Sequence, residues 1–78
     1  MKEFSVMFCQ YETGDVCDTN LDIFMGKGEI YHYFDTYEEA LKYGNRIMSM
    51  NRDLEFMIYN SQKEVIFYQN PEDRKKRN

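Results

Sequence analysis

The chain contains no tryptophan, one proline, one histidine and two cysteines among its 78 residues. Two cysteines are too few for a disulfide framework, and Cys9 and Cys17 form no Cys-x-x-Cys motif, so we expect both to be free thiols. One histidine and two cysteines hardly provide the ligands of a zinc site. With only four glycines, the composition is also unlike that of a low-complexity chain.

Long apolar segments are absent as well. No run approaches the ~20 apolar residues that a membrane-spanning helix needs. The first five residues, Met-Lys-Glu-Phe-Ser, do not begin an extended apolar segment of the kind found in secretory signals. The sequence therefore predicts a cytoplasmic protein without membrane attachment.

Basic residues are scarce outside the C-terminus. The net charge is −4, but residues 74–77 supply four positive charges, so residues 1–73 hold six basic against fourteen acidic residues, or −8. A folded body with this charge repels phosphates, which argues against general nucleic-acid binding. The same charge could attract a basic partner.

The clearest element is a helix that begins near residue 35 or 36. Either Asp35 caps it with Glu38, or Thr36 caps it with Glu39, and both pairs form a capping box. Beyond the cap, apolar residues recur at helical spacing, and the pattern stops near Met50 and Asn51. The predicted buried stripe comprises Ala40, Leu41, Gly44, Ile47 and Met48. Glycine at position 44 would let a strand approach closely.

Alternation with period two predicts three strands around this helix. Residues 4–11 alternate, with Phe4, Val6 and Phe8 on one side. Residues 54–59 and 65–69 flank the polar turn 60–63 and predict a hairpin. In the second strand of this hairpin, Val65 and Phe67 are expected to face opposite to Ile66 and Tyr68.

The segment between residues 12 and 34 allows two interpretations. Residues 12–22 are acidic and predict a loop, followed by a hairpin of strands 21–25 and 29–34 around the glycines at 26 and 28. The alternative is one long loop from residue 12 to residue 28. If Phe34 joins the core, Ile30 and His32 share its side and Tyr31 and Tyr33 face away; the reverse assignment would expose His32.

These elements predict an α+β fold. We expect a mainly antiparallel sheet of four or five strands, with one α-helix packed on one face and the order β-β-β-α-β-β. Residues 1–70 would form a single domain, and residues 71–78 a frayed basic tail. The proline at position 71 suits a helix start, but too few residues follow for a helix to stand alone.

One helix is too narrow to cover such a sheet, so the opposite face should stay uncovered. That face is unusually rich in aromatic residues and methionine, which are enriched at protein interfaces. It would carry Met7, Cys9, Tyr11, Tyr31, Tyr33, Met57, Tyr59, Ile66 and Tyr68. We take Tyr11, Tyr31, Tyr33, Met57, Tyr59 and Tyr68 as the candidate interaction surface. The plainer alternative is that the tyrosines half-bury their rings against one another and keep their hydroxyls wet.

Catalytic and metal-binding patterns are weak. Asp18, Asn20, Asp22 and Glu29 match the spacing of a calcium loop, but Ile23 occupies the position that requires glycine. His32 has no evident nucleophile or orienting group, and the acidic surroundings of Cys17 raise rather than lower a thiol pKa. We therefore expect no enzyme, no metal site and no cofactor.

The sequence favours a small non-catalytic protein-interaction domain that forms a homodimer through the Tyr/Met-rich face or an edge strand. A second hypothesis is an acidic inhibitor from a phage or mobile element that mimics nucleic acid on a basic host protein. A third, RNA binding by the tyrosines and the basic tail, has the wrong charge on the body. The expected partner is a second copy of the chain or another protein, and nucleic acid is not expected.

Overall fold

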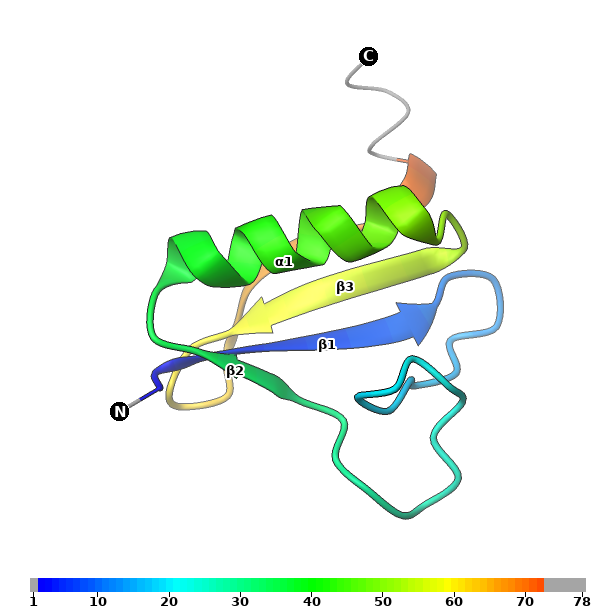
Figure 1. Ribbon diagram of the computed structural model, residues 1–78, viewed down its shortest axis with the longest axis horizontal. Helices are drawn as coiled ribbons and strands as arrows, with labels where there is room; N and C mark the ends of the chain where they lie inside the picture. The colour runs from blue at the N-terminus through cyan, green and yellow to red at the C-terminus, as the bar shows by residue number, and fades with distance from the viewer. Residues whose placement is uncertain (1, 73–78) are drawn as a thin grey trace.

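A computed structural model describes residues 2–72, which form a four-stranded antiparallel sheet with one helix across one face (Figure 1). The elements are β1 (Phe4–Gln10), β2 (His32–Phe34), α1 (Tyr37–Met50), β3 (Leu54–Tyr59) and β4 (Val65–Gln69), and the strand order is β2-β1-β3-β4. The predicted α+β fold is confirmed. Among the described residues, no helix has the length and apolar character needed to cross a membrane.

The start of α1 follows the second of the two capping predictions. Thr36 is the N-cap: its hydroxyl oxygen accepts a hydrogen bond from the Glu39 backbone N–H at 3.1 Å and donates to the Glu39 carboxylate at 3.1 Å. Thr36 therefore caps the helix as predicted, but the Glu39 carboxylate bonds to the Thr36 hydroxyl in place of the Thr36 backbone N–H that a capping box uses. At the other end, the N–H of Asn51 donates to the Ile47 carbonyl at 2.9 Å, so the helix ends where the sequence predicts.

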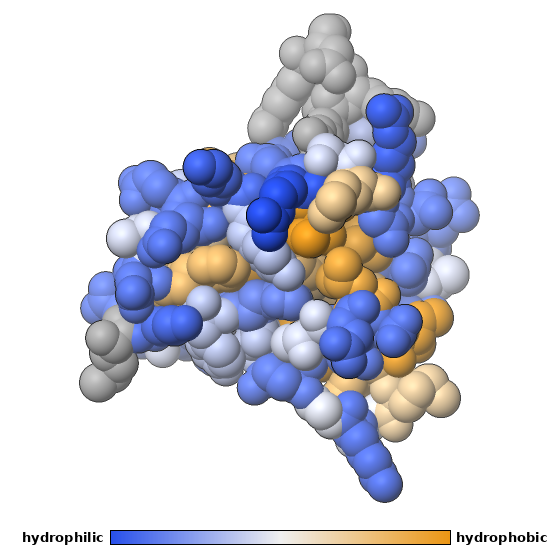
Figure 2. Space-filling view, viewed as in Figure 1, coloured by the Kyte–Doolittle hydropathy of each residue, from blue (hydrophilic) through white to orange (hydrophobic). Residues whose placement is uncertain are grey.

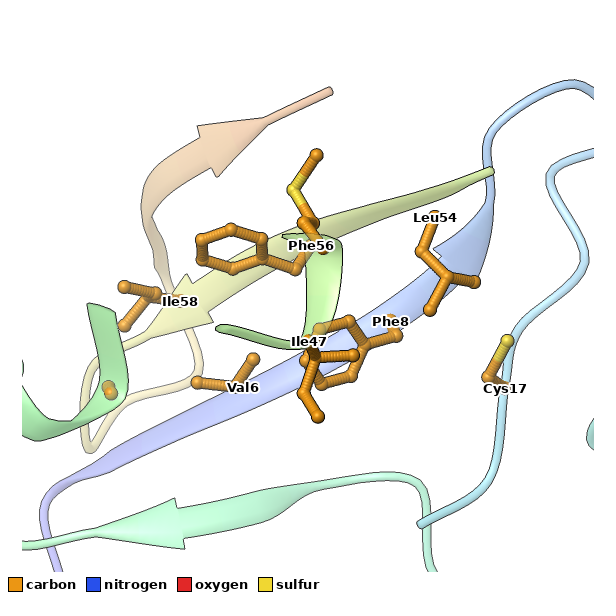
Figure 3. Packing of buried hydrophobic residues seen from close by; sticks show 9 residues of the cluster. Val6, Phe8, Cys17, Ile47, Leu54, Phe56 and Ile58 are labelled. Atoms are coloured by element: carbon orange, nitrogen blue, oxygen red, sulfur yellow. The ribbon is translucent and has the colours of Figure 1, made fainter. Parts of the chain in front are cut away.

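The core lies between α1 and the inward side of the sheet (Figure 3). Four of the five predicted helix positions are buried, and Leu41 packs against them half-buried. The buried cluster comprises Val6, Phe8, Cys17, Ala40, Ile47, Met48, Leu54, Phe56 and Ile58. Gly44 has a particular role, because a Cβ atom at this position would overlap the ring of Phe56. The close approach predicted for this glycine is therefore confirmed.

The strand registers define which side chains face the helix. Phe4 pairs with Phe34 and Val6 with both His32 and Ile58, so these side chains share the helix side of the sheet. The expectation that His32 lies on the core side is confirmed. Tyr33, next to it on β2, is exposed on the opposite face.

The hairpin predicted for residues 21–34 is wrong, and the long-loop alternative is closer. Residues 21–25 form no strand beyond a single bridge from Cys17 to Ile23, and β2 is limited to His32–Phe34. The loop is held by its own polar groups: the Asp18 carboxylate accepts bonds from the backbone N–H groups of Asn20 and Asp22 at 2.9 and 3.1 Å. These local bonds compete with strand pairing, as is usual for aspartate in turns.

The same loop also contributes to the sheet and to the core. The Cys17 N–H donates to the Phe8 carbonyl at 2.8 Å, and Cys9 bridges Val16. The chain therefore lines the part of β1 that the short β2 does not reach, and it delivers the Cys17 side chain into the core (Figure 3).

The facing of Val65 also differs from the prediction. A register shift lies between Ile58 and Tyr59, so that Phe67 pairs with Ile58 but Val65 pairs with Tyr59. This β-bulge inserts one residue and reverses the expected alternation at the start of β4. Of the predicted C-terminal tail, Pro71 and Glu72 are helical, and residues 73–78 lie outside the described part.

Candidate interaction face

The side of the sheet opposite α1 has no helix packed on it within residues 2–72, and we call it the tyrosine face. Across the strands it forms three rows, of which the first is Tyr33, Ser5, Tyr59 and Val65. The second is Met7, Met57 and Tyr68, and the third is Cys9 and Glu55. Tyr31, just before β2, adds its ring to the first row.

The two tyrosines of the first row and Tyr31 form an aromatic cluster next to the ammonium group of Lys63. The Tyr31 ring lies 5.6 Å from that of Tyr59 and 6.2 Å from that of Tyr33, centroid to centroid. The Lys63 ammonium lies 3.9 Å from the Tyr31 centroid and 4.8 Å from the Tyr33 centroid. It donates to Ser5 Oγ at 3.3 Å and approaches the Tyr33 hydroxyl at 3.5 Å. Cation–π attraction and these hydroxyls hold the lysine over the sheet.

The second and third rows meet at Tyr68. Its hydroxyl donates a hydrogen bond to the Glu55 carboxylate and accepts one from Asn70 Nδ2 at 3.3 Å. Partial burial and the bond to Glu55 raise the pKa of Tyr68, so its hydroxyl stays protonated at neutral pH. On the neighbouring strand, the Tyr59 hydroxyl contacts the Met57 sulfur at 3.6 Å, and burial also raises the pKa of Tyr59.

Five of the six residues predicted for the interaction surface belong to this face or to its aromatic cluster. Tyr11 differs, because it follows the end of β1 and its backbone N–H donates to the Asp53 carbonyl at 2.8 Å in the adjoining turn. Its side chain is half-buried, and its nearness to Tyr68 contributes to the raised pKa of that residue. Tyr11 therefore lies at the rim of the face.

The exposed apolar residues gather on β2 and β4. Seven large hydrophobic side chains are exposed among residues 2–72, and four of them belong to these two edge strands. They are Tyr33, Val65, Ile66 and Tyr68, each between 42% and 53% exposed. The other three, Ile23, Met25 and Met50, lie on the loop and at the end of α1. In the view of Figure 2, hydrophobic surface runs from the middle to the right, with a smaller separate area on the left, between hydrophilic side chains.

The prediction that Cys9 is uncovered on this face is wrong, because its side chain is buried. Its backbone pairs with Val16 of the loop. Burial, followed by the nearby charge of Glu55, raises the pKa of the Cys9 thiol to about 11. Burial, followed by the nearby carboxylates of Asp18 and Asp15, also raises the pKa of Cys17. Both cysteines are free and hold their protons at neutral pH, which is unlike a nucleophilic thiol.

His32 is packed as a core residue. Its Nδ1 lies 3.2 Å from the Tyr43 hydroxyl, its ring meets Phe8 edge-on at 5.4 Å, and its Nε2 is buried without a hydrogen-bond partner in the described structure. Burial lowers the pKa of His32, which therefore favours the neutral ring.

Two carboxylates of the calcium-like pattern, those of Asp18 and Glu29, bond to backbone groups of the loop. The carboxylate of Glu29 accepts bonds from the N–H groups of Ile30 and Tyr31 at 2.9 and 3.1 Å, as that of Asp18 does from its own turn. Within residues 2–72, no group of three or more acidic, histidine or cysteine side chains is placed to hold a metal ion.

Sequence reasoning missed Lys63 and Ser5. Lys63 belongs to a turn that was predicted to be merely polar, and its φ of 62° is left-handed, which lysine seldom adopts. The local pattern around Lys63 and Ser5 gives no signal for their contact, because 58 positions separate the two residues. Comparison with protein-family models, curated proteins and solved structures finds no match for this chain.

Proposed function

We propose that the protein is a small non-catalytic interaction domain that self-associates through the tyrosine face. The observation that carries this proposal is the one-sided cover of the sheet. The helix packs on one side, while the other carries tyrosine and methionine side chains in two adjoining rows. Antiparallel sheets commonly leave one face to solvent, but that face is then mostly polar.

The residue types suit an interface between proteins. Aromatic residues and methionine are enriched in interface centres because aromatic rings bury a large area and methionine side chains adapt to irregular surfaces. The middle row of Met7, Met57 and Tyr68 carries no formal charge at neutral pH. Two copies can therefore bring these rows together although each chain has a net charge of −4.

The experiment is light scattering over a series of concentrations, with Tyr33→Ser and Tyr59→Ser as test variants. Each removes an aromatic ring from both halves of a symmetric contact, and we expect dimer dissociation constants raised about 10- to 100-fold. Met25→Ser is the matched control, because Met25 is 86% exposed but lies outside the face.

The outcomes distinguish a specific interface from nonspecific association. Association that is weakened by the two tyrosine changes and indifferent to Met25→Ser supports the proposal. A wild-type protein that stays monomeric throughout the series contradicts it. So does a dimer that Met25→Ser weakens as much as the tyrosine variants do.

The acidic inhibitor is the second candidate, and the exposed carboxylates of the loop favour it. Glu12, Asp15 and Asp22 are exposed there. Rising salt distinguishes the two functions, because a nucleic-acid mimic loses its basic partner while a dimer built mainly on apolar contact persists. The two free, buried thiols are compatible with the reducing cytoplasm, where we place the dimer.

A further inference from the structure

The tyrosine face is electrically asymmetric. Among its strand residues only Glu55 is charged, and it lies in the third row opposite Cys9. The Lys63 ammonium lies over the first row, bound to Ser5. From Ser5 to Cys9 the strand advances about 13 Å, at roughly 3.3 Å per residue. One cation and one carboxylate therefore occupy opposite ends of the face, with the uncharged middle row between them.

This arrangement is self-complementary under two-fold symmetry. Consider a two-fold axis that lies just above the tyrosine face and parallel to the sheet. It passes over the midpoint of the line from Lys63 to Glu55 and is perpendicular to that line. Rotation about this axis places Lys63 of each copy over Glu55 of the other, so both pairs form at once, as an isologous contact requires. The same axis passes over the middle row, which brings Met7 and Met57 of the two copies together.

Neither charge is neutralised within the described chain. The contacts of the Lys63 ammonium in residues 2–72 are with hydroxyls and ring faces, and no carboxylate is among them. Glu55 accepts a hydrogen bond from Tyr68 and has no basic partner in the same part of the structure. An apolar contact that closed over either charge without pairing it would incur a large desolvation cost.

We infer that two copies of the chain associate face to face in this orientation, with Lys63 of each copy paired with Glu55 of the other across a centre of methionines. This inference rests on the proposed function, and it adds the orientation of the two copies and the residues that select it. The charge pairs set the register and exclude arrangements that would bring like charges together.

The test is a charge exchange measured by analytical ultracentrifugation. Lys63→Glu alone opposes two glutamates at each pair, and Glu55→Lys alone opposes two lysines, so each single variant should dimerise about 10-fold or more weakly. A mixture of the two variants should form a heterodimer, because every pair is again of opposite sign. The double variant with both changes should recover a homodimer.

Matched controls carry the same charge changes elsewhere. Lys27→Glu and Glu12→Lys alter two exposed loop residues that lie outside the face. They should leave the dissociation constant within about two-fold of wild type, since the charges of exposed groups are largely screened by solvent and salt. Circular dichroism verifies that each variant is folded.

The outcomes distinguish the two proposals. A wild-type monomer contradicts the proposed function itself. A wild-type dimer whose affinity does not respond to either single change, or whose affinity is not recovered in the mixture or the double variant, overturns the orientation but leaves self-association standing. Recovery in both the mixture and the double variant supports the orientation.

Discussion

Gly44 of α1 lies directly against the ring of Phe56 in β3, so closely that a Cβ atom on residue 44 would overlap that ring. The ring is itself enclosed, with Phe8 at 5.9 Å and Phe67 at 5.6 Å between centroids. The contact sets how near the helix lies to the sheet. It also explains why a residue unfavourable to helices stands in the middle of one.

Gly44→Ala should therefore destabilise the fold. Alanine gains about 1 kcal/mol in helix propensity over glycine, but overpacking a filled core costs about 1–3 kcal/mol. We expect a net loss near 1 kcal/mol in the free energy of unfolding, measured by denaturant titration. Lys42→Ala, at an exposed position of the same helix, should change little. A more stable Gly44→Ala protein would show that the helix can move outward freely.

The two possible N-cap residues, Thr36 and Asp35, should differ in how much their substitution lowers stability. Thr36→Ala removes the hydroxyl that accepts from the Glu39 N–H and should cost about 1 kcal/mol of stability. Asp35→Ala removes a neighbouring carboxylate that has no role in the cap, and the change should be within about 0.5 kcal/mol. Equal losses in the two variants, or the reverse order, would contradict the cap assignment.

His32 should make the protein sensitive to acid. Burial lowers the pKa of His32 below the ordinary value near 6.5 that the unfolded chain retains. The unfolded state therefore takes up the proton first, and stability falls as the pH drops below about 6.5. Above that pH, His32 is neutral in both states and contributes no pH dependence.

His32→Phe isolates this contribution from that of the carboxylates. Phenylalanine retains a ring against Phe8 and Tyr43 and removes the buried Nε2 that lacks a partner. Between pH 7 and pH 5, the melting temperature of this variant should decline less than that of the wild type. Parallel declines in the two proteins would show that His32 protonates as easily folded as unfolded.

The sequence predicts the parts of the fold that local pattern controls. The helix limits depend on residues within one turn of each other, such as Thr36 and Glu39, and the alternation of β1 and β3 places their side chains correctly. Close packing at Gly44 was also predictable, because glycine is unfavourable inside a helix and its place on the apolar stripe indicates that a neighbouring element packs tightly there.

Features that depend on distant partners were not predictable. Lys63 reaches Ser5 across 58 positions, and nothing in the local pattern of either residue indicates that contact. The glycines at 26 and 28 do adopt positive φ, as in a turn, but the flanking residues bond within the loop instead of pairing as strands. The bulge that reorients Val65 likewise depends on the fit between β3 and β4.

Methionine methyl groups provide a direct probe of the proposed interface. Met7 and Met57 lie side by side in the middle row of the tyrosine face. Met48 is buried on the side of α1 that faces the sheet, while Met25 and Met50 are exposed away from the face. Isotope labelling of the methionine methyls thus places reporters at the interface, in the core and on the remaining surface.

The decisive measurement is the methyl NMR spectrum of this labelled protein over a series of concentrations. We expect the Met7 and Met57 signals to shift as the protein associates, while those of Met25, Met48 and Met50 stay in place. Signals of Met7 and Met57 that do not move while the protein dimerises, or movement confined to Met25 and Met50, would contradict an interface at the tyrosine face.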